Sequence, residues 1–152
     1  MKRKLPIIKG KSIKLDIGCG TVKHKGFIGI DVRDCGQEIV WDVRGGIPLP
    51  DNSVEFIWSN HVLEHFDNDE LKDLFREFYR ILKKGGVVQT VVPHQLDPTA
   101  YYFDHKTFWN EARIDTLTGV PGLEGFKVIK NMMSNKLNTR ARLELLFELK
   151  KI

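Results

Sequence analysis

Two glycines and a carboxylate near the start of the chain have the types and spacing of a ligand-binding turn. Gly18 and Gly20 follow the apolar run 13–17, and Asp31 ends a second apolar run at 27–30. Glycine adopts positive φ and lets a ligand approach the backbone without meeting a Cβ. A carboxylate at the end of a strand in an open α/β sheet faces the ligand crevice, where it can accept charge-assisted hydrogen bonds from a ribose diol. The stretch therefore predicts a pocket for a nucleoside-containing cofactor.

The spacing around this turn argues against cofactors that carry a pyrophosphate. The dinucleotide fingerprint needs a third glycine that opens a helix, with an acid about 20 residues further on. Here Lys23 stands at that third position, and Asp31 comes much sooner. The short link 21–26 is too small for the helix whose N-terminus would bind phosphates. S-adenosylmethionine has a ribose and an adenine but no phosphate, so the turn favours it over NAD, FAD and nucleoside triphosphates.

Several segments, in this order, resemble the class I S-adenosylmethionine-dependent methyltransferases, in particular compact members of the type-11 group. They are residues 15–20, Asp31, residues 47–57, residues 61–65 and residues 82–86. The short link after Gly20 and the missing later glycine depart from the usual pattern. The resemblance implies an α/β fold with a Rossmann-like, mostly parallel seven-stranded sheet. Its last strand is expected to be antiparallel, and helices are reduced after the first three strands.

The resemblance also implies roles for individual residues. Asp31 is expected to bind the ribose, and Asp42 to accept a hydrogen bond from the adenine amino group while the backbone of Val43 contacts the ring. Asp16 is expected to hold the glycine turn through backbone N–H groups, and Cys19 to be a small turn residue rather than a nucleophile. The expected cofactor contacts are Asp16, Gly18, Cys19, Gly20, Asp31, Val32, Asp42, Val43, Asn60 and His61.

Histidines supply the candidates for proton transfer, because the imidazole pKa lies near neutral pH. We expect His65 or His94 to act as the base for a hydroxyl or amine acceptor. The polar, aromatic segment 94–105 is expected to face the acceptor, which we predict to be a small molecule or a saccharide. A non-catalytic protein that binds S-adenosylmethionine or a nucleoside is an alternative.

A second alternative comes from the sequence His61-x-x-Glu64-His65, which matches the H-x-x-E-H pattern of zinc peptidases. Such a zinc hydrolase needs the motif on a long helix, together with a third ligand. The segment follows an apolar run directly and spans only about two helical turns before the polar stretch 67–69. We therefore expect no metal site.

Hydrophobic periodicity places the elements that position these residues. Strands are expected at 13–17, 27–30, 39–41, 54–59 and 87–92, followed by an antiparallel pair at 126–132 and 142–150. The second member of the pair alternates apolar and charged residues, as on a half-exposed edge. A helix is expected at 69–84, capped by Asn68 or Asp69 and closed by Gly85, with a weaker helix at 105–117. Few helices separate the first four strands, so one face of the sheet should be thinly covered.

Composition limits the remaining possibilities. The 152 residues suit a single domain, with residues 1–11 as a basic tail or entry loop. No apolar run is long enough to cross a membrane or to act as a signal peptide. The two cysteines form no disulfide framework, which favours the cytoplasm. The net charge of +4 comes from scattered lysines, which do not favour a nucleic-acid partner; the sequence does not indicate an oligomeric state.

Overall fold

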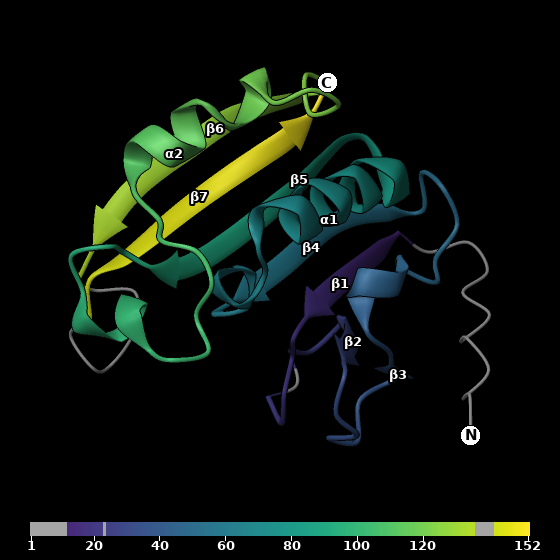
Figure 1. Cartoon of the computed structure of the whole chain (residues 1–152). Helices are drawn as coiled ribbons and strands as arrows, with labels where there is room; N and C mark the ends of the chain where they lie inside the picture. The colour runs from purple at the N-terminus through teal and green to yellow at the C-terminus, as the bar shows by residue number, and fades with distance from the viewer. Residues whose placement is uncertain (1–11, 23, 136–141) are drawn as a thin grey trace.

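The computed structural model describes residues 12–22, 24–135 and 142–152, so the tail expected at 1–11 lies outside the described residues. Within that part of the chain, seven strands form one sheet in the order β3-β2-β1-β4-β5-β7-β6 (Figure 1). The strands are β1 (Ile13–Ile17), β2 (Ile28–Asp31), β3 (Ile39–Val40), β4 (Val54–Asn60), β5 (Leu82–Pro93), β6 (Phe126–Ser134) and β7 (Glu144–Lys151). The helices are α1 (Asn68–Ile81) and α2 (Glu111–Asp115), with 3₁₀ turns η1 (Val43–Gly45), η2 (Leu63–His65), η3 (Pro98–Tyr101) and η4 (Leu117–Gly119).

The first five strands run parallel to one another, and β7 is antiparallel to both of its neighbours, β5 and β6. This confirms the predicted mixed sheet. The prediction that 142–150 forms an edge was wrong, because β7 lies inside the sheet and β6 forms the edge. On one face of β7, Leu145, Phe147 and Leu149 are fully buried. On the other face Glu144 and Leu146 are buried as well, and Lys150 is exposed.

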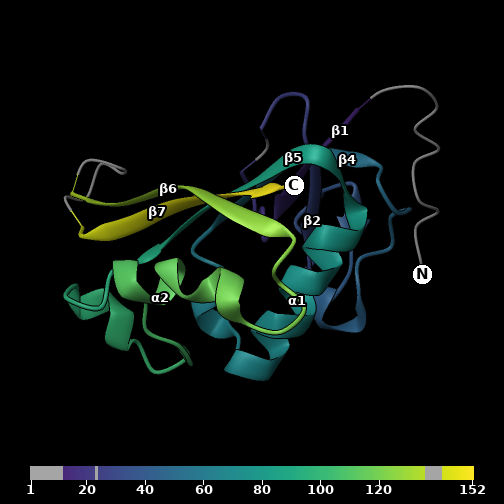
Figure 2. The same cartoon turned by 90° about the horizontal axis from the view of Figure 1, so that it is seen from above.

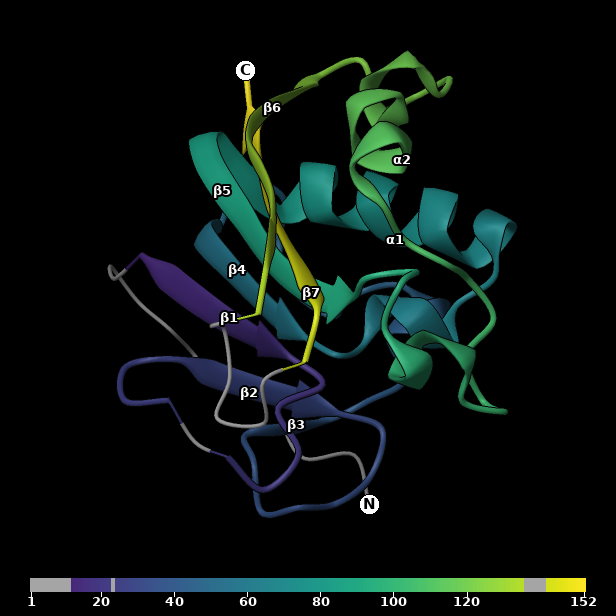
Figure 3. The same ribbon diagram turned by 90° about the vertical axis from the view of Figure 1, so that its left-hand side faces the viewer.

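Both α-helices lie on the same face of the sheet (Figures 2 and 3). The core therefore forms between α1, α2 and the side chains that β1, β4, β5 and β7 direct toward them. On the other face, ring edges of His24 and Phe27 from the loop after β1 meet Trp58 and Phe56 of β4. No helix among residues 12–22, 24–135 and 142–152 covers that face, in agreement with the thin covering that was predicted.

The predicted helix 69–84 is α1, which begins and ends slightly earlier than expected. Its buried stripe is the predicted one and consists of Leu71, Leu74, Phe75, Phe78 and Ile81. The cap is Asp67, whose side chain accepts from the backbone of Asp69 and Glu70, while the Glu70 side chain accepts from Asp67 N. The helix ends before Gly85 because Leu82 is already extended and pairs with Val54 of β4.

The weaker helix predicted at 105–117 is reduced to α2, which Asn110 caps by accepting from Arg113 N. The residues just before α2 do not join the helix because two of their N–H groups bind elsewhere. Lys106 N and Thr107 N both donate to the carbonyl oxygen of Glu64, at 2.7 and 3.2 Å. This contact brings residues 105–107 against η2, beside the carboxyl end of β4. No helix of the described residues is long and apolar enough to span a bilayer.

Candidate active site

A cavity of about 530 Å³ opens where β1, β2 and β4 end. Its walls come from the glycine turn, the loops after β2 and β3, η2 and the loop that precedes α2. The lining residues are Ile17, Gly18, Ile30, Asp31, Val32, Arg33, Trp41, Asp42, Val43, Arg44, His61, Val62, His65, Phe66 and Asp104. This is the edge at which open α/β sheets bind ligands, and the volume lies within the range of small-molecule pockets.

Gly18 is the position where the cavity needs a glycine. Its φ is +66°, and a Cβ built there would lie 2.3 Å from Cγ2 of Val62, a lining residue. Its N–H donates to the carbonyl of Ile30 at 2.8 Å, which ties the turn to the end of β2. The bare backbone at Gly18 therefore keeps the cavity wall open.

We expect Gly18→Ala to weaken S-adenosylhomocysteine binding at least tenfold, because the new methyl would displace Val62 into the cavity and the backbone would be strained at positive φ. Calorimetry measures the affinity. Gly20→Ala is the matched control, because Gly20 also has positive φ but a Cβ there meets nothing within 4 Å. Equal losses in the two variants would contradict a specific role for the space at Gly18.

Asp31 lies at the floor of the cavity and is 8% exposed. Its Oδ2 accepts from Gly20 N and its Oδ1 from Arg33 N, both at 2.9 Å. A carboxylate offers about four lone-pair sites, so the hydrogen bonds from the described residues leave two for a ligand, with Arg33 Nε 3.8 Å from Oδ1. Asp31 thus holds the glycine turn, which is the contact we had expected from Asp16.

Asp16 faces away from this cavity. Its carboxylate is 3% exposed and lies 2.7 Å from Nδ1 of His24, and burial raises its pKa. It lines a smaller cavity with Cys19 on the other side of the turn. Burial and the nearby carboxylates raise the pKa of Cys19 to about 11, so the thiol is unreactive and acts as a small turn residue.

The other predicted cofactor residues divide into two groups. Val32, Asp42, Val43 and His61 line the cavity, whereas Asn60, at the exposed end of β4, does not. Asp42 caps η1 by accepting from Arg44 N at 3.0 Å, and this fixes the backbone of Val43 at the cavity wall.

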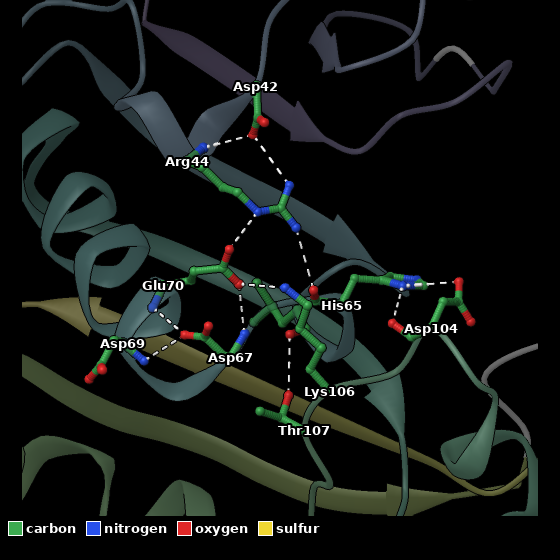
Figure 4. A network of polar contacts seen from close by, with 10 residues as sticks. Asp42, Arg44, His65, Asp67, Asp69, Glu70, Asp104, Lys106 and Thr107 are labelled. Atoms are coloured by element: carbon green, nitrogen blue, oxygen red, sulfur yellow. Dashed lines mark hydrogen bonds and ion pairs between the residues drawn. The ribbon is translucent and has the colours of Figure 1, made fainter.

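Arg44, which the sequence analysis did not identify, ties the rim of the cavity together (Figure 4). Its Nε donates to Glu70 at 2.8 Å, its Nη2 lies 3.4 Å from the carbonyl oxygen of His65, and its guanidinium stacks over Phe66. Glu70 in turn accepts from Lys106 Nζ at 3.1 Å. The network joins η1, α1 and the segment before α2.

The Glu70 carboxylate, which also forms the capping box, has its pKa lowered to about 2. The causes are the hydrogen bond from Asp67 N and then those from Lys106 and Arg44. A folded-state pKa below the ordinary 4.5 gives stability that is present above pH 4.5 and lost as the pH falls toward 2.

We expect Glu70→Gln to cost about 1 kcal/mol at pH 7, or about 2–4 °C in the melting temperature. The difference from the wild type should shrink between pH 4.5 and 2. Thermal unfolding followed by circular dichroism measures both effects. Asp69→Asn is the control, because Asp69 lies in the same turn but its side chain is exposed and, among the described residues, pairs with Lys72. A pH-independent difference for Glu70→Gln would contradict this account.

His61 lies between two buried carboxylates. Its φ is +53°, its Nε2 is 2.6 Å from Oε1 of Glu144, and its Nδ1 is 3.3 Å from Oε1 of Glu64. Burial alone lowers the pKa of this imidazole, but the two carboxylates outweigh burial and raise it. Because both of its ring nitrogens already contact carboxylates, His61 is a poor proton acceptor.

The structure brings only one of the two candidate bases to the cavity. His65 lines it, with Nδ1 at 3.3 Å from both the carbonyl oxygen and Oδ2 of Asp104, which leaves Nε2 as an acceptor (Figure 4). His94 is 3% exposed and outside the cavity lining. Its ring nitrogens are engaged by Leu96 N at 3.2 Å and by Glu111 at 3.1 Å, so it holds loops in place.

The motif His61-x-x-Glu64-His65 does not form the helical zinc site of a peptidase. His61 follows β4 at positive φ, and Glu64 and His65 sit in the single turn η2. The two histidines therefore do not share a helix face, which the hydrolase alternative requires.

Comparisons with known proteins agree with this architecture. Residues 31–90 match the model of a methyltransferase domain family. A solved S-adenosylmethionine-dependent methyltransferase from Methanosarcina mazei superposes with a TM-score of 0.72 at 18% identity, covering 95% of this chain and 94% of that one. Another from Archaeoglobus fulgidus gives 0.67 at 20% identity, covering 98% and 90%. No curated protein matches the sequence.

A third solved structure, the N-methyltransferase NodS from Bradyrhizobium japonicum in complex with S-adenosylhomocysteine, gives a TM-score of 0.67 at 15% identity and covers 92% of this chain and 78% of that one. At these identities, the structural likeness establishes the fold. This is the fold that the sequence motifs predicted, and the family model that matches residues 31–90 is that of a methyltransferase domain.

Proposed function

We propose that the cavity binds S-adenosylmethionine and that the protein methylates a hydroxyl or amine of a small-molecule or saccharide-type acceptor in the cytoplasm. The observation that carries this proposal is Asp31, a buried acid with two remaining acceptor sites, which faces a cavity of about 530 Å³ over a turn that lacks a helix. Such a site suits a ribose without a pyrophosphate. The solved NodS structure, which shares the fold, is a complex with S-adenosylhomocysteine.

The residues of the cavity fit the parts of this cofactor. Asp31 would bind the ribose hydroxyls, Asp42 the adenine amino group and the backbone of Val43 the ring. The bare backbone at Gly18 leaves room beside Val62. When bound, the cofactor supplies a methyl group that a sulfonium already activates.

The chain's own task is then to position the acceptor and remove its proton. Holding two reactants in line can supply about 7–11 kcal/mol of a barrier. His65 is the histidine at the open side of the cavity, and Asp104 fixes its ring through Nδ1. We propose that His65 meets the reacting group of the acceptor and activates it.

The test of this function is the formation of S-adenosylhomocysteine from S-adenosylmethionine. It is measured in the presence of panels of saccharides, amines and small phenols. We expect release that depends on at least one acceptor. Tight cofactor binding without turnover on any panel would favour the alternative of a non-catalytic binding protein. Failure to bind S-adenosylhomocysteine at all would overturn the proposal.

A further inference from the structure

Three potential metal ligands meet beside the cavity, at the wall that His65 forms. One ligand atom from each of Glu64, His65 and His105 lies within 4.8 Å of the other two. The chain's five histidines and two cysteines all lie in residues that the structure describes. Among those residues, this is the one group of three such side chains close enough to hold an ion. His65 and the neighbouring Asp104 both line the cavity.

Two members of the group have buried polar atoms that accept or donate no hydrogen bond among the described residues. Glu64 is 1% exposed, and neither carboxylate oxygen accepts a hydrogen bond from the described residues; its ion-pair contact is His61 at 3.3 Å. Nδ1 of His105 is also buried, and it has no hydrogen-bond partner among the described residues. Burying such groups unsatisfied is costly, and a cation between them would remove that cost.

We propose that Glu64, His65 and His105 bind one divalent ion of the zinc class. One carboxylate and two imidazoles are the donor set of catalytic zinc sites that keep a fourth position open. Bonds of about 2.0–2.2 Å would bring the ligand atoms to about 3.4 Å apart. Rotation of the His65 and His105 rings, whose centroids are already 4.8 Å apart, supplies this closure.

The hydrogen-bond and ion-pair partners of His65 and Glu64 are of the kind that metal-ligating residues have. A ligating histidine usually donates its second ring N–H to a carboxylate or carbonyl. His65 Nδ1 faces both kinds of oxygen on Asp104, which leaves Nε2 for the ion. Glu64 is held from the other side by His61. This ligand set differs from the peptidase motif, because His61 supports the site from outside and His105 supplies the third ligand.

The proposed ion deepens the function proposed above and rests on it. Its open position would face the cavity and take an oxygen of the acceptor, whose pKa would fall so that the proton leaves to water. His65 would then activate the acceptor as a metal ligand rather than as the proton acceptor itself. The acceptor class that follows is a hydroxyl compound rather than a thiol or a carbon nucleophile.

Metal binding can be tested without turnover. The full chain, prepared without a histidine tag and stripped with a chelator, is titrated with Zn²⁺ by calorimetry and with Co²⁺ by visible absorption. We expect one ion per chain and four-coordinate Co²⁺ bands. His105→Ala and, independently, Glu64→Gln should each weaken Zn²⁺ binding at least about 100-fold, because each removes one of three ligands. His24→Gln is the control, since His24 pairs with Asp16 away from the group.

The melting temperature of each variant establishes whether it folds. If either His105→Ala or Glu64→Gln does not fold, the other still tests the site. Absence of stoichiometric Zn²⁺ binding, or equal affinity in the wild type, His105→Ala and Glu64→Gln, would overturn the proposed site. Loss of Zn²⁺ binding in His24→Gln alone would show that the ion binds elsewhere, and this result would also overturn the proposed site. S-adenosylhomocysteine affinity, measured on the same samples, reports separately on the proposed function.

Discussion

Replacing His65 by alanine should lower the rate of methyl transfer by about 10²–10⁴-fold, the usual loss when a group that assists proton removal from the acceptor is deleted. S-adenosylhomocysteine affinity should stay within about threefold of the wild type, because Asp31, Asp42 and Val43 make the proposed cofactor contacts. The measurement is the rate of S-adenosylhomocysteine formation with the best acceptor of the panel, beside calorimetry of the same sample.

The control for this prediction is His94→Gln. His94 lies outside the cavity and joins Leu96 N to Glu111, so its loss should lower the melting temperature but preserve the rate where the protein is folded. A His65→Ala variant that retains full activity would refute the role of His65. A larger loss of rate in folded His94→Gln than in His65→Ala would reverse the assignment of the two histidines.

Asp31→Asn should weaken S-adenosylhomocysteine binding by about 100-fold. Two hydrogen bonds from ribose hydroxyls to a charged acceptor contribute about 1.5 kcal/mol each, and 1.4 kcal/mol is a tenfold change in affinity. Asparagine keeps the shape of the side chain, but its amide N–H₂ would oppose Gly20 N or a ribose hydroxyl. Calorimetry gives the dissociation constants.

Asp34→Asn is the matched control, because Asp34 is exposed on the same loop and lies outside the cavity lining. Its affinity for S-adenosylhomocysteine should equal that of the wild type. An Asp31→Asn variant that binds as tightly as the wild type would remove the ribose assignment. Because Asp31 also holds the glycine turn, we expect Asp31→Asn to have a lower melting temperature. The affinities are therefore compared at a temperature where both variants are folded.

Local sequence patterns were sufficient to predict the sheet and its main helix. The stripe of Leu71, Leu74, Phe75 and Phe78 could lie on one face only of a helix, and the apolar run 87–92 could only be a buried strand. The features that were wrong depend on contacts with distant segments. Residues 105–110 form no helix because the N–H groups of Lys106 and Thr107 donate to the carbonyl oxygen of Glu64. The helix α1 ends before Gly85 because Leu82 pairs with β4.

The residues of the candidate site also fall into two groups: those that local patterns could predict and those whose positions depend on distant contacts. Gly18, Asp31 and Asp42 could be placed together because parallel strands bring their carboxyl ends to one edge of the sheet. The alternation of side chains within β1 could not reveal that Asp16 would pair with His24 behind the turn. Arg44 carried no local signal, because its partner Glu70 comes from α1. His105 ends the segment 94–105 that was predicted to face the acceptor, but no local pattern indicated that it meets His65 of η2.

Calorimetric titration of the wild-type protein with S-adenosylhomocysteine and, separately, with NAD⁺ tests most directly whether the cleft suits an adenosine without phosphates. The account predicts one molecule of S-adenosylhomocysteine bound per chain and no heat of binding with NAD⁺. Binding of NAD⁺ with comparable affinity, or no binding of S-adenosylhomocysteine, would contradict it.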